Sequence, residues 1–145
     1  FVMVDDIWEL TMEGVPVWKW YARHHIPQYT YVHADNVNPN KDFIHGNTLH
    51  YDVHEGVIYY NSRHMDTMWK INKTSGECLW AIGRYGDVPM LSLAGKPVKQ
   101  LFSHSHGLTR IAESTFVTFD NDAFMHPGFH TTCGTSKVKE ITFDP

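Results

Sequence analysis

The chain has 145 residues, 12 basic against 16 acidic side chains, and a formal net charge of −4. No stretch is a block of Lys and Arg, which argues against nucleic acid as a partner. No apolar run reaches the roughly 18 residues that a membrane-spanning helix needs, so no membrane span is expected. The length suits about one domain. Because the chain begins at Phe1 and ends directly after a strand-like stretch, we expect it to be a mature form or a part of a longer protein.

Short alternating segments, rich in β-branched and aromatic residues, follow one another along the whole chain. In order they read DDIWEL, VPVWKWYA, GVIYYNS, MDTMWKIN, ECLWAIG, TFVTFDN and KVKEITF. Turn signals such as MEG, HEG, KTSGE and AES separate them, and helical periodicity is hard to find. The pattern predicts an all-β fold of antiparallel hairpins.

The sequence of one of these hairpins is repeated in the chain. The segment HGNTLHYDVHEGVIYYNSR runs from His45 to Arg63, and HSHGLTRIAESTFVTFDND runs from His104 to Asp122, 59 residues later. Laid over each other without a gap, His45 meets His104, Leu49 meets Leu108 and Val57 meets Phe116. Self-similarity at a fixed period is the signature of a repeat architecture. The segments therefore predict two equivalent inner hairpins.

A second similarity supplies the outer hairpins of the same repeat. IWELTMEGVPVWKW at Ile7 to Trp20 resembles MWKINKTSGECLWAI at Met68 to Ile82, and VKEITF at Val138 to Phe143 looks like the start of a third copy. Four antiparallel strands per period are the blades of a β-propeller. The extra length of each period lies in two loops, 21–43 and 84–100.

The chain then divides as one partial propeller domain, 1–145, of about two and a half blades. Residues 1–43 are expected to end one blade, 44–100 to form a full blade, and 101–145 to form most of the next. A ring closes with roughly four to eight blades, so further chain or other subunits would complete it. The alternative, a lone open sandwich, would leave long exposed strand edges.

The propeller arrangement predicts where some of the eleven histidines lie. Inner strands line the channel of a propeller, so Asn47 and His106 are expected at equivalent channel-side positions, with His45 and His104 matched beside them. Repeated apolar residues are explained by a core, whereas polar residues repeated beside them need another reason. A shared site in the channel supplies that reason.

At this point the sequence resembles a family. The motifs HGN, YYNSRH, MWKINKTSGECLWAIG, FSHSHGLTRI and VTFDND, which together cover roughly Asp6 to Pro145, are similar to the arylsulfate sulfotransferases. The resemblance implies a six-bladed propeller, exported from the cytoplasm, that moves a sulfuryl group from an aryl sulfate to a phenol. It also implies a covalent sulfohistidine intermediate, no nucleotide sulfate donor and no cofactor.

The resemblance assigns roles to particular residues. His106 matches the nucleophilic histidine, and His45, Asn47 and Arg63 match the residues that hold the sulfate group. Relatives often have Gln before the nucleophile, whereas this chain has Ser105 with His104 beside it, so the assignment stays open between His104 and His106. A further active-site histidine of an earlier blade has no counterpart here.

The chemistry is physically sensible. Attack at sulfur needs a neutral imidazole, Arg63 offers a planar fork of donors to the sulfuryl oxygens, and His45 could protonate the departing phenolate. Tyr60 and Phe102, with His104, are candidates for contact with the substrate. A non-catalytic propeller that acts as a binding or structural module is the alternative function.

Three secondary expectations complete the interpretation. Asn72 opens a glycosylation triplet in the turn NKTSGE, and Cys78 and Cys133 are candidates for one disulfide, although two free thiols are about as plausible. Both features agree with an extracytoplasmic location, either secreted or periplasmic.

No metal is expected, although a zinc site that uses His126 and His130 is an alternative. The remaining histidines are expected in loops or at the surface: His24, His25, His33, His50, His54 and His64.

Overall fold

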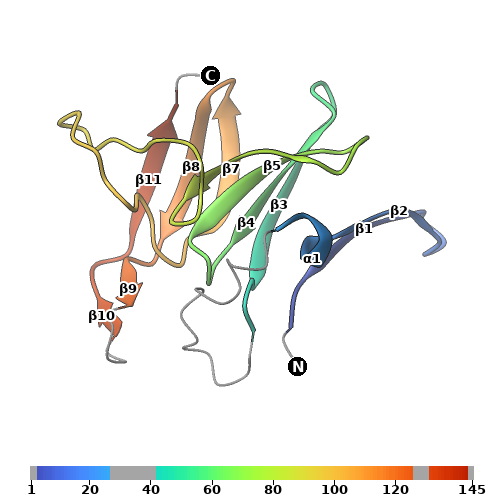
Figure 1. Cartoon of the computed structure of the whole chain (residues 1–145), viewed down its shortest axis with the longest axis horizontal. Coiled ribbons are helices and arrows are strands. Elements are labelled where there is room, and N and C mark those ends of the chain that lie inside the picture. The colour runs from blue at the N-terminus through green and yellow to red at the C-terminus, as the bar shows by residue number, and fades with distance from the viewer. Residues whose placement is uncertain (1–2, 27–41, 126–130, 144–145) are drawn as a thin grey trace.

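The computed structural model describes residues 3–26, 42–125 and 131–143, and within this part the chain folds almost entirely as β-strands (Figure 1). The side chains of residues 123–125 and 131–133 are not described, and His33, His126 and His130 lie outside the described residues. The all-β prediction is confirmed. The elements are β1 (Asp6–Leu10), β2 (Pro16–Tyr21), α1 (Ala22–His25), β3 (Gly46–Asp52), β4 (Val57–Ser62), β5 (Thr67–Asn72), β6 (Cys78–Gly83), β7 (His106–Ala112), β8 (Thr115–Asp120), β9 (Ala123–Met125), β10 (Thr131–Cys133) and β11 (Lys137–Thr142).

The strands form antiparallel sheets whose connections follow the predicted repeat. The order β3-β4-β5-β6 is a four-stranded meander, and β11-β8-β7 forms a three-stranded sheet beside it. β1 and β2 pair as the predicted outer hairpin, and so do β5 and β6. β11, the predicted start of a third copy, pairs with β8 as β5 pairs with β4. The sequence similarity thus corresponds to equivalent places in three sheets.

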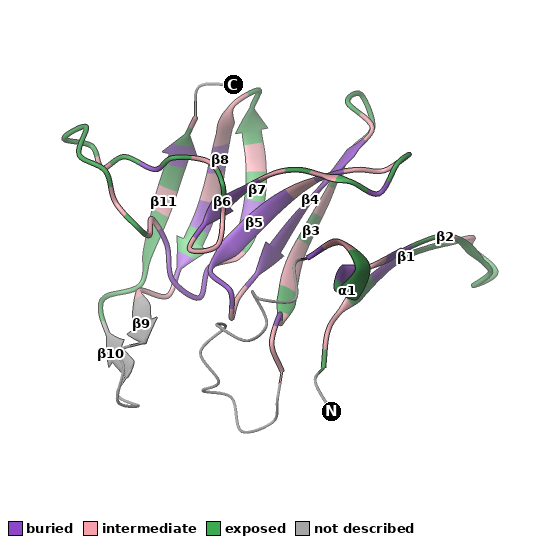
Figure 2. Cartoon of the chain, viewed as in Figure 1, coloured by how far each residue is buried: buried purple, intermediate pink, exposed green. Residues whose placement is uncertain are grey.

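The four-stranded sheet lies between two hydrophobic cores. Ile58 and Tyr60 of β4 belong to the core that contains Ile7 and Trp20 of the β1–β2 hairpin. The alternate residues of β4 belong to a second core, shared with β7, β8 and β11. Every residue of β4 is therefore buried, as Figure 2 shows along this strand. Such face-to-face stacking of sheets is the packing that adjacent propeller blades require.

The ungapped overlay of the two inner hairpins is right for the first strand and wrong by one residue for the second. Val57 and Phe116 both belong to the second core, but they reach it from the two sheets that face each other across it. The ladder explains the slip: Tyr51 pairs with Ile58, whereas its counterpart Arg110 pairs with Phe116, because the register of the second hairpin shifts between Arg110 and Ala112. A one-residue shift turns every side chain of a strand to the other face. Phe116 therefore corresponds to Ile58.

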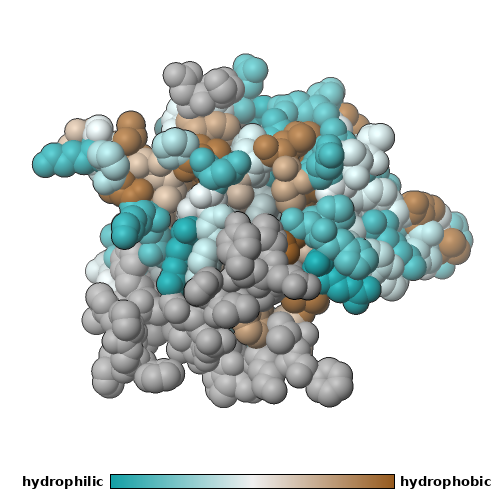
Figure 3. Space-filling model, in the orientation of Figure 1, coloured by the Kyte–Doolittle hydropathy of each residue, from teal (hydrophilic) through white to brown (hydrophobic). Residues whose placement is uncertain are grey.

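Leu49 and Leu108 occupy matching inner strands but have very different environments. Leu108 is 3% exposed because the full β3–β6 sheet covers it, whereas Leu49 is 51% exposed because the sheet on its side consists of the outer strands β1 and β2. Other exposed apolar residues gather on the projecting β1–β2 hairpin (Figure 3), namely Leu10, Met12, Val15 and Val17. These exposed groups mark a face where the repeat predicts more β structure.

Helix α1 has four residues, so no helix in the described part of the chain is long or apolar enough to cross a membrane. Among the tryptophans, Trp69 is buried and Trp18 and Trp80 pack at the edges of the cores. Trp8 is the exception, since it is half exposed and lies under the ammonium group of Lys19. The aromatic content is used mainly to join neighbouring sheets.

Candidate functional site

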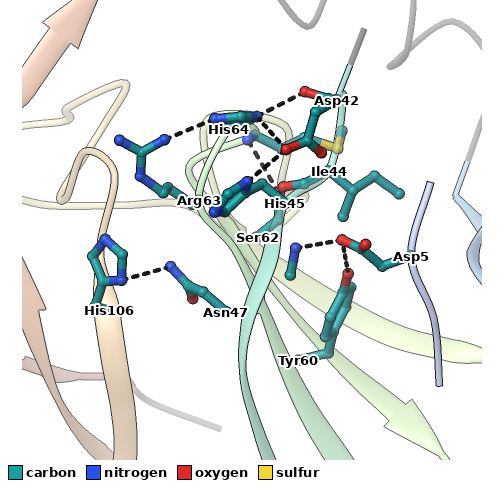
Figure 4. Close-up of polar contacts among 12 residues, drawn as sticks. Asp5, Asp42, Ile44, His45, Asn47, Tyr60, Ser62, Arg63, His64 and His106 are labelled. Atoms are coloured by element: carbon teal, nitrogen blue, oxygen red, sulfur yellow. Dashed lines mark hydrogen bonds and ion pairs between the residues drawn. The ribbon is translucent and has the colours of Figure 1, made fainter. Parts of the chain in front are cut away.

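The ends of three strands bring most of the predicted site residues together. His45 directly precedes β3, Arg63 and His64 directly follow β4, and His106 begins β7, which packs beside β3. In Figure 4, Arg63 lies between His64 and His106. Residues far apart in the sequence thus meet because two neighbouring sheets present the same end of their inner strands.

Both histidines that open the repeat have left-handed backbone conformations. The φ angle is 50° at His45 and 51° at His104, an uncommon region for residues other than glycine. Such conformations cost of the order of 1–3 kcal/mol and persist where surrounding contacts impose them. Here the carbonyl of His45 accepts the N–H of Arg63 at 3.0 Å, and the N–H of His104 donates to Asp66 Oδ1 at 2.5 Å. The repeat therefore preserves a strained turn as well as a residue type.

Asn47 links the first inner strand to the second. Its Nδ2 donates to the carbonyl of Ser105 at 2.7 Å and lies 3.1 Å from His106 Nδ1. Its Oδ1 accepts from Asn61 Nδ2 at 2.9 Å, and Asn61 Nδ2 also donates to the Ser105 carbonyl at 3.1 Å. Since a carbonyl can only accept, the amide of Asn47 can have only one orientation. The prediction that Asn47 and His106 share one site is consistent with this contact.

The contact with Asn47 fixes the protonation of His106. Because Asn47 donates to Nδ1, that nitrogen is an acceptor and a neutral ring carries its proton on Nε2. Partial burial lowers the pKa of His106, and the nearby positive charges of Arg63 and His45 lower it further. The ring is consequently neutral at pH 7, which is the form a nucleophile needs.

His45 is part of a cluster that the sequence did not predict. Its Nδ1 lies 2.6 Å from Asp42 Oδ2, and its ring is 4.6 Å from the ring of His64. His64 Nδ1 donates to the backbone carbonyl of Asp42 at 2.7 Å, and Arg63 donates to His64 Nε2 at 2.8 Å. Side-chain burial lowers the pKa of His64. The carboxylate three residues before His45 was the available signal.

His64 lies in the turn that follows β4, in agreement with the expected loop or surface position, but most of its side chain is covered. Its side chain is only 16% exposed, because it lies between Asp42 and Arg63. In the sequence, only the position of His64 directly after Arg63 could have indicated that its side chain is covered, since both residues directly follow the same strand, β4. His64 therefore sets where the guanidinium of Arg63 is held.

His104 lies beneath this cluster. It is 6% exposed, its Nε2 is buried without a hydrogen-bond partner, and its ring meets His64 edge-on at 5.9 Å. Burial, followed by the charges of Arg63 and His64, lowers the pKa of His104 to about 4. His104 is therefore a neutral, buried group, and His106 is the more accessible of the two candidate nucleophiles.

Asp66 joins the histidines to a neighbouring cavity. Burial raises the pKa of Asp66 to about 7, opposed by hydrogen bonds from the His104 N–H and from Gln100 Nε2. The cavity has a volume of about 590 Å³ beneath the 84–100 loop, where Asp66, Arg84 and Gln100 are among its lining residues. His45, Asn47 and His106 lie outside that lining.

The two aromatic candidates for substrate contact occupy the cores. Tyr60 is 3% exposed and stacks on Trp69, with its hydroxyl donating to Asp5 Oδ2 at 3.4 Å. Phe102 is 1% exposed in the second core. Neither ring has a free face for an aryl group in this structure, so both have packing roles.

The remaining predicted residues lie elsewhere. Asn72 ends β5 at a turn, where its Oδ1 accepts the N–H groups of Thr74 and Ser75. Cys78 has no disulfide partner among the described side chains, and burial raises the pKa of its thiol to about 11. The side chain of Cys133 lies outside the described residues. Glycosylation and the disulfide both stay predictions.

The fold and the site together define a class: an all-β repeat protein whose neighbouring inner strands bring an arginine and several histidines to one end. A family comparison agrees, since the model of the arylsulfotransferase (ASST) family matches residues 2–137. The chain belongs to the arylsulfotransferase family. Comparisons with curated proteins and with solved structures gave no match.

Proposed function

We propose that this protein moves a sulfuryl group from an aryl sulfate to a phenolic acceptor through a sulfohistidine formed on His106. Membership of the arylsulfotransferase family supports the reaction type. The observation that carries the residue assignment is the contact of Asn47 with His106, since it joins two repeat copies through their polar residues. The nearby charges of Arg63 and His45 that act on His106 support the same site.

The first half-reaction starts with an exchange of hydrogen bonds. The lone pair of His106 Nδ1 is engaged by the amide of Asn47. A sulfuryl oxygen that accepts the same N–H releases this lone pair for attack at sulfur. A sulfur–nitrogen bond forms as the sulfur–oxygen bond to the aryl group breaks. Asn47 then stabilises the transferring group and ceases to restrain the nucleophile.

Arg63 and His45 have complementary roles in this scheme. The guanidinium of Arg63 stabilises charge on the sulfuryl oxygens, held in position by His64. A protonated His45 gives its proton to the departing phenolate and later accepts one from the acceptor phenol. Asp42, whose Oδ2 lies 2.6 Å from Nδ1 of His45, orients the ring of His45. The reaction needs no cofactor.

The chain supplies one part of a six-bladed β-propeller, with residues 1–43, 44–100 and 101–145 as successive blade portions. The stacked sheets and the exposed Leu49 support this arrangement. Further chain or other subunits complete the ring, and the protein works outside the cytoplasm. An intact mass of the native material tests this, since a mass well above 16.8 kDa would reveal further blades or glycans.

The mechanism is tested by trapping the intermediate. The protein is mixed with 4-nitrophenyl sulfate without an acceptor, quenched, and mapped by peptide mass analysis. We expect one sulfuryl group on His106, abolished by His106→Ala and retained by His54→Ala, which removes an exposed histidine. Label on His104 would move the nucleophile by two residues. No labelled histidine, together with normal turnover by His106→Ala, would leave the binding-module alternative.

A further inference from the structure

Asp42, His45 and His64 form a group of ligand atoms that lies beside the proposed reaction centre. One side-chain ligand atom from each residue lies within 4.8 Å of the other two. Asp42 Oδ2 is 2.6 Å from His45 Nδ1 and 3.9 Å from His64 Nδ1. Ligands about 2.0–2.1 Å from a tetrahedral zinc ion lie about 3.3 Å from one another. The two measured separations bracket that value, so small side-chain movements would centre an ion.

The chemistry of the three groups suits a transition metal rather than calcium or magnesium. Two imidazoles and one carboxylate are the ligands that zinc uses at sites with an open coordination position. All three side chains are partly exposed, with His45 the most open at 43%, so an ion can reach them from solvent. Exposure also leaves the fourth position to water or to an anion.

Arg63 opposes metal binding at this group. Its NH1 donates to His64 Nε2, so the proton of the neutral His64 ring lies on Nδ1 and is donated to the Asp42 carbonyl. To coordinate through Nδ1, His64 must carry its proton on Nε2 instead, which breaks the contact with Arg63. The positive guanidinium also repels a cation. A bound metal and the present position of Arg63 are therefore competing states.

From this geometry we propose that Asp42, His45 and His64 bind one divalent transition-metal ion such as Zn²⁺, and that the bound ion inhibits sulfuryl transfer. Inhibition rests on the proposed function, because the ion would occupy the imidazole of His45 and displace Arg63 from His64. Metal binding itself rests only on the three ligands. Zinc binding and transfer are alternative uses of one cluster.

Binding is measured by isothermal titration of the metal-stripped protein with ZnCl₂. We expect one equivalent to bind, and Asp42→Asn, His45→Ala and His64→Ala each to weaken it by at least about 10-fold. Arg63→Ala should instead bind zinc more tightly, by about fivefold or more, the factor that removing one charge repulsion in water provides. His54→Ala and Cys78→Ser are controls, because each removes a residue of a metal-ligating type that lies outside the cluster. Both variants should bind zinc as the wild type does.

The variant His106→Ala, which the proposed function expects to lose turnover, separates this inference from the proposed function. It should bind zinc as the wild type does, whether or not His106 is the nucleophile. Absence of saturable binding by the wild type would overturn the proposal, as would undiminished binding by all three ligand variants. Circular dichroism of each variant identifies any that has unfolded, and paired removal of Asp42 and His64 then decides the case. Zinc binding without inhibition would overturn only the inhibitory part.

Discussion

The two copies of the inner hairpin share their backbone and differ in their chemistry. In each copy, the last residue of the second strand holds the loop that precedes the first. Ser62 donates its hydroxyl to the carbonyl of Ile44, and Asp120 accepts the N–H of Ser103 at 2.7 Å. One copy does this with a neutral hydroxyl and the other with a fully buried carboxylate. Equivalent places in a repeat can therefore keep a structural role while the group changes.

The copies differ more after these residues. β4 is followed by the short segment 63–66, which carries Arg63 and His64, whereas β8 is followed by Asp122 and the β9–β10 hairpin. Asp66 and Asp122 both have left-handed backbones before the next strand, with φ of 47° and 52°. Asp66 holds the His104 backbone of the following copy, whereas Asp122 pairs with Lys137. The site is thus built between copies rather than within one.

The largest expected difference between the copies is in turnover. Arg63→Ala should lower kcat/KM by about 100- to 1000-fold, because it removes a donor to the transferring group. Asp122→Asn, which removes a charge after the second strand of the other copy and tolerates the left-handed backbone, should leave turnover nearly unchanged. Steady-state rates with an aryl sulfate and a phenol measure both. Equal losses in the two variants would assign Arg63 a structural role.

The buried ends of β4 and β8 should differ in their contribution to stability. Asp120→Ala removes a carboxylate that accepts two N–H groups and pairs with Lys139 at 2.5 Å. We expect a loss of about 3–5 kcal/mol in the free energy of unfolding. Ser62→Ala removes two neutral hydrogen bonds, one to the Ile44 carbonyl and one from the Met65 N–H, and should cost about 1–2 kcal/mol. Urea unfolding compares them, and similar costs would contradict the distinction.

Leu49 and Leu108, which match in the two copies, test how much a complete neighbouring sheet contributes to the free energy of unfolding. Leu108→Ala should cost about 2–5 kcal/mol, because its side chain is buried in the second core. Leu49→Ala should cost well under about 1 kcal/mol in the form described here, because half of that side chain is exposed. If assembly of the ring covers Leu49, the two costs should become similar in the assembled protein.

The sequence predicted the hairpins well because alternation and turn residues are local signals. The ungapped overlay also placed His45, Asn47 and His106 at the starts of inner strands, and neighbouring sheets bring these strand ends together. It could not predict the register shift between Arg110 and Ala112, because nothing in the alignment opens a gap there. Asp42, His64 and the burial of Tyr60 depend on packing between segments, which no local pattern encodes.

At the junction of the two copies, His104 and Asp66 should respond to pH with opposite signs. The folded pKa of His104, about 4, is below the ordinary 6.5. Between these values the unfolded chain binds more protons, so stability falls as the pH is lowered. The folded pKa of Asp66, about 7, is above the ordinary 3.8, so stability falls as the pH is raised. Each slope is at most about 1.4 kcal/mol per pH unit.

The two slopes have opposite signs and should nearly cancel between pH 4 and 6.5 in the wild type. The neighbouring charges of Arg63, His64 and His106 are common to every variant compared, so they do not affect the differences between variants. Asp66→Asn keeps an acceptor for the His104 N–H but cannot ionise. Its stability should therefore rise by up to about 3 kcal/mol over this range relative to the wild type. His104→Asn, which also tolerates the left-handed backbone, should show a relative fall. Urea unfolding in buffers containing EDTA measures both, and parallel pH profiles for all three proteins would mean that neither group titrates abnormally.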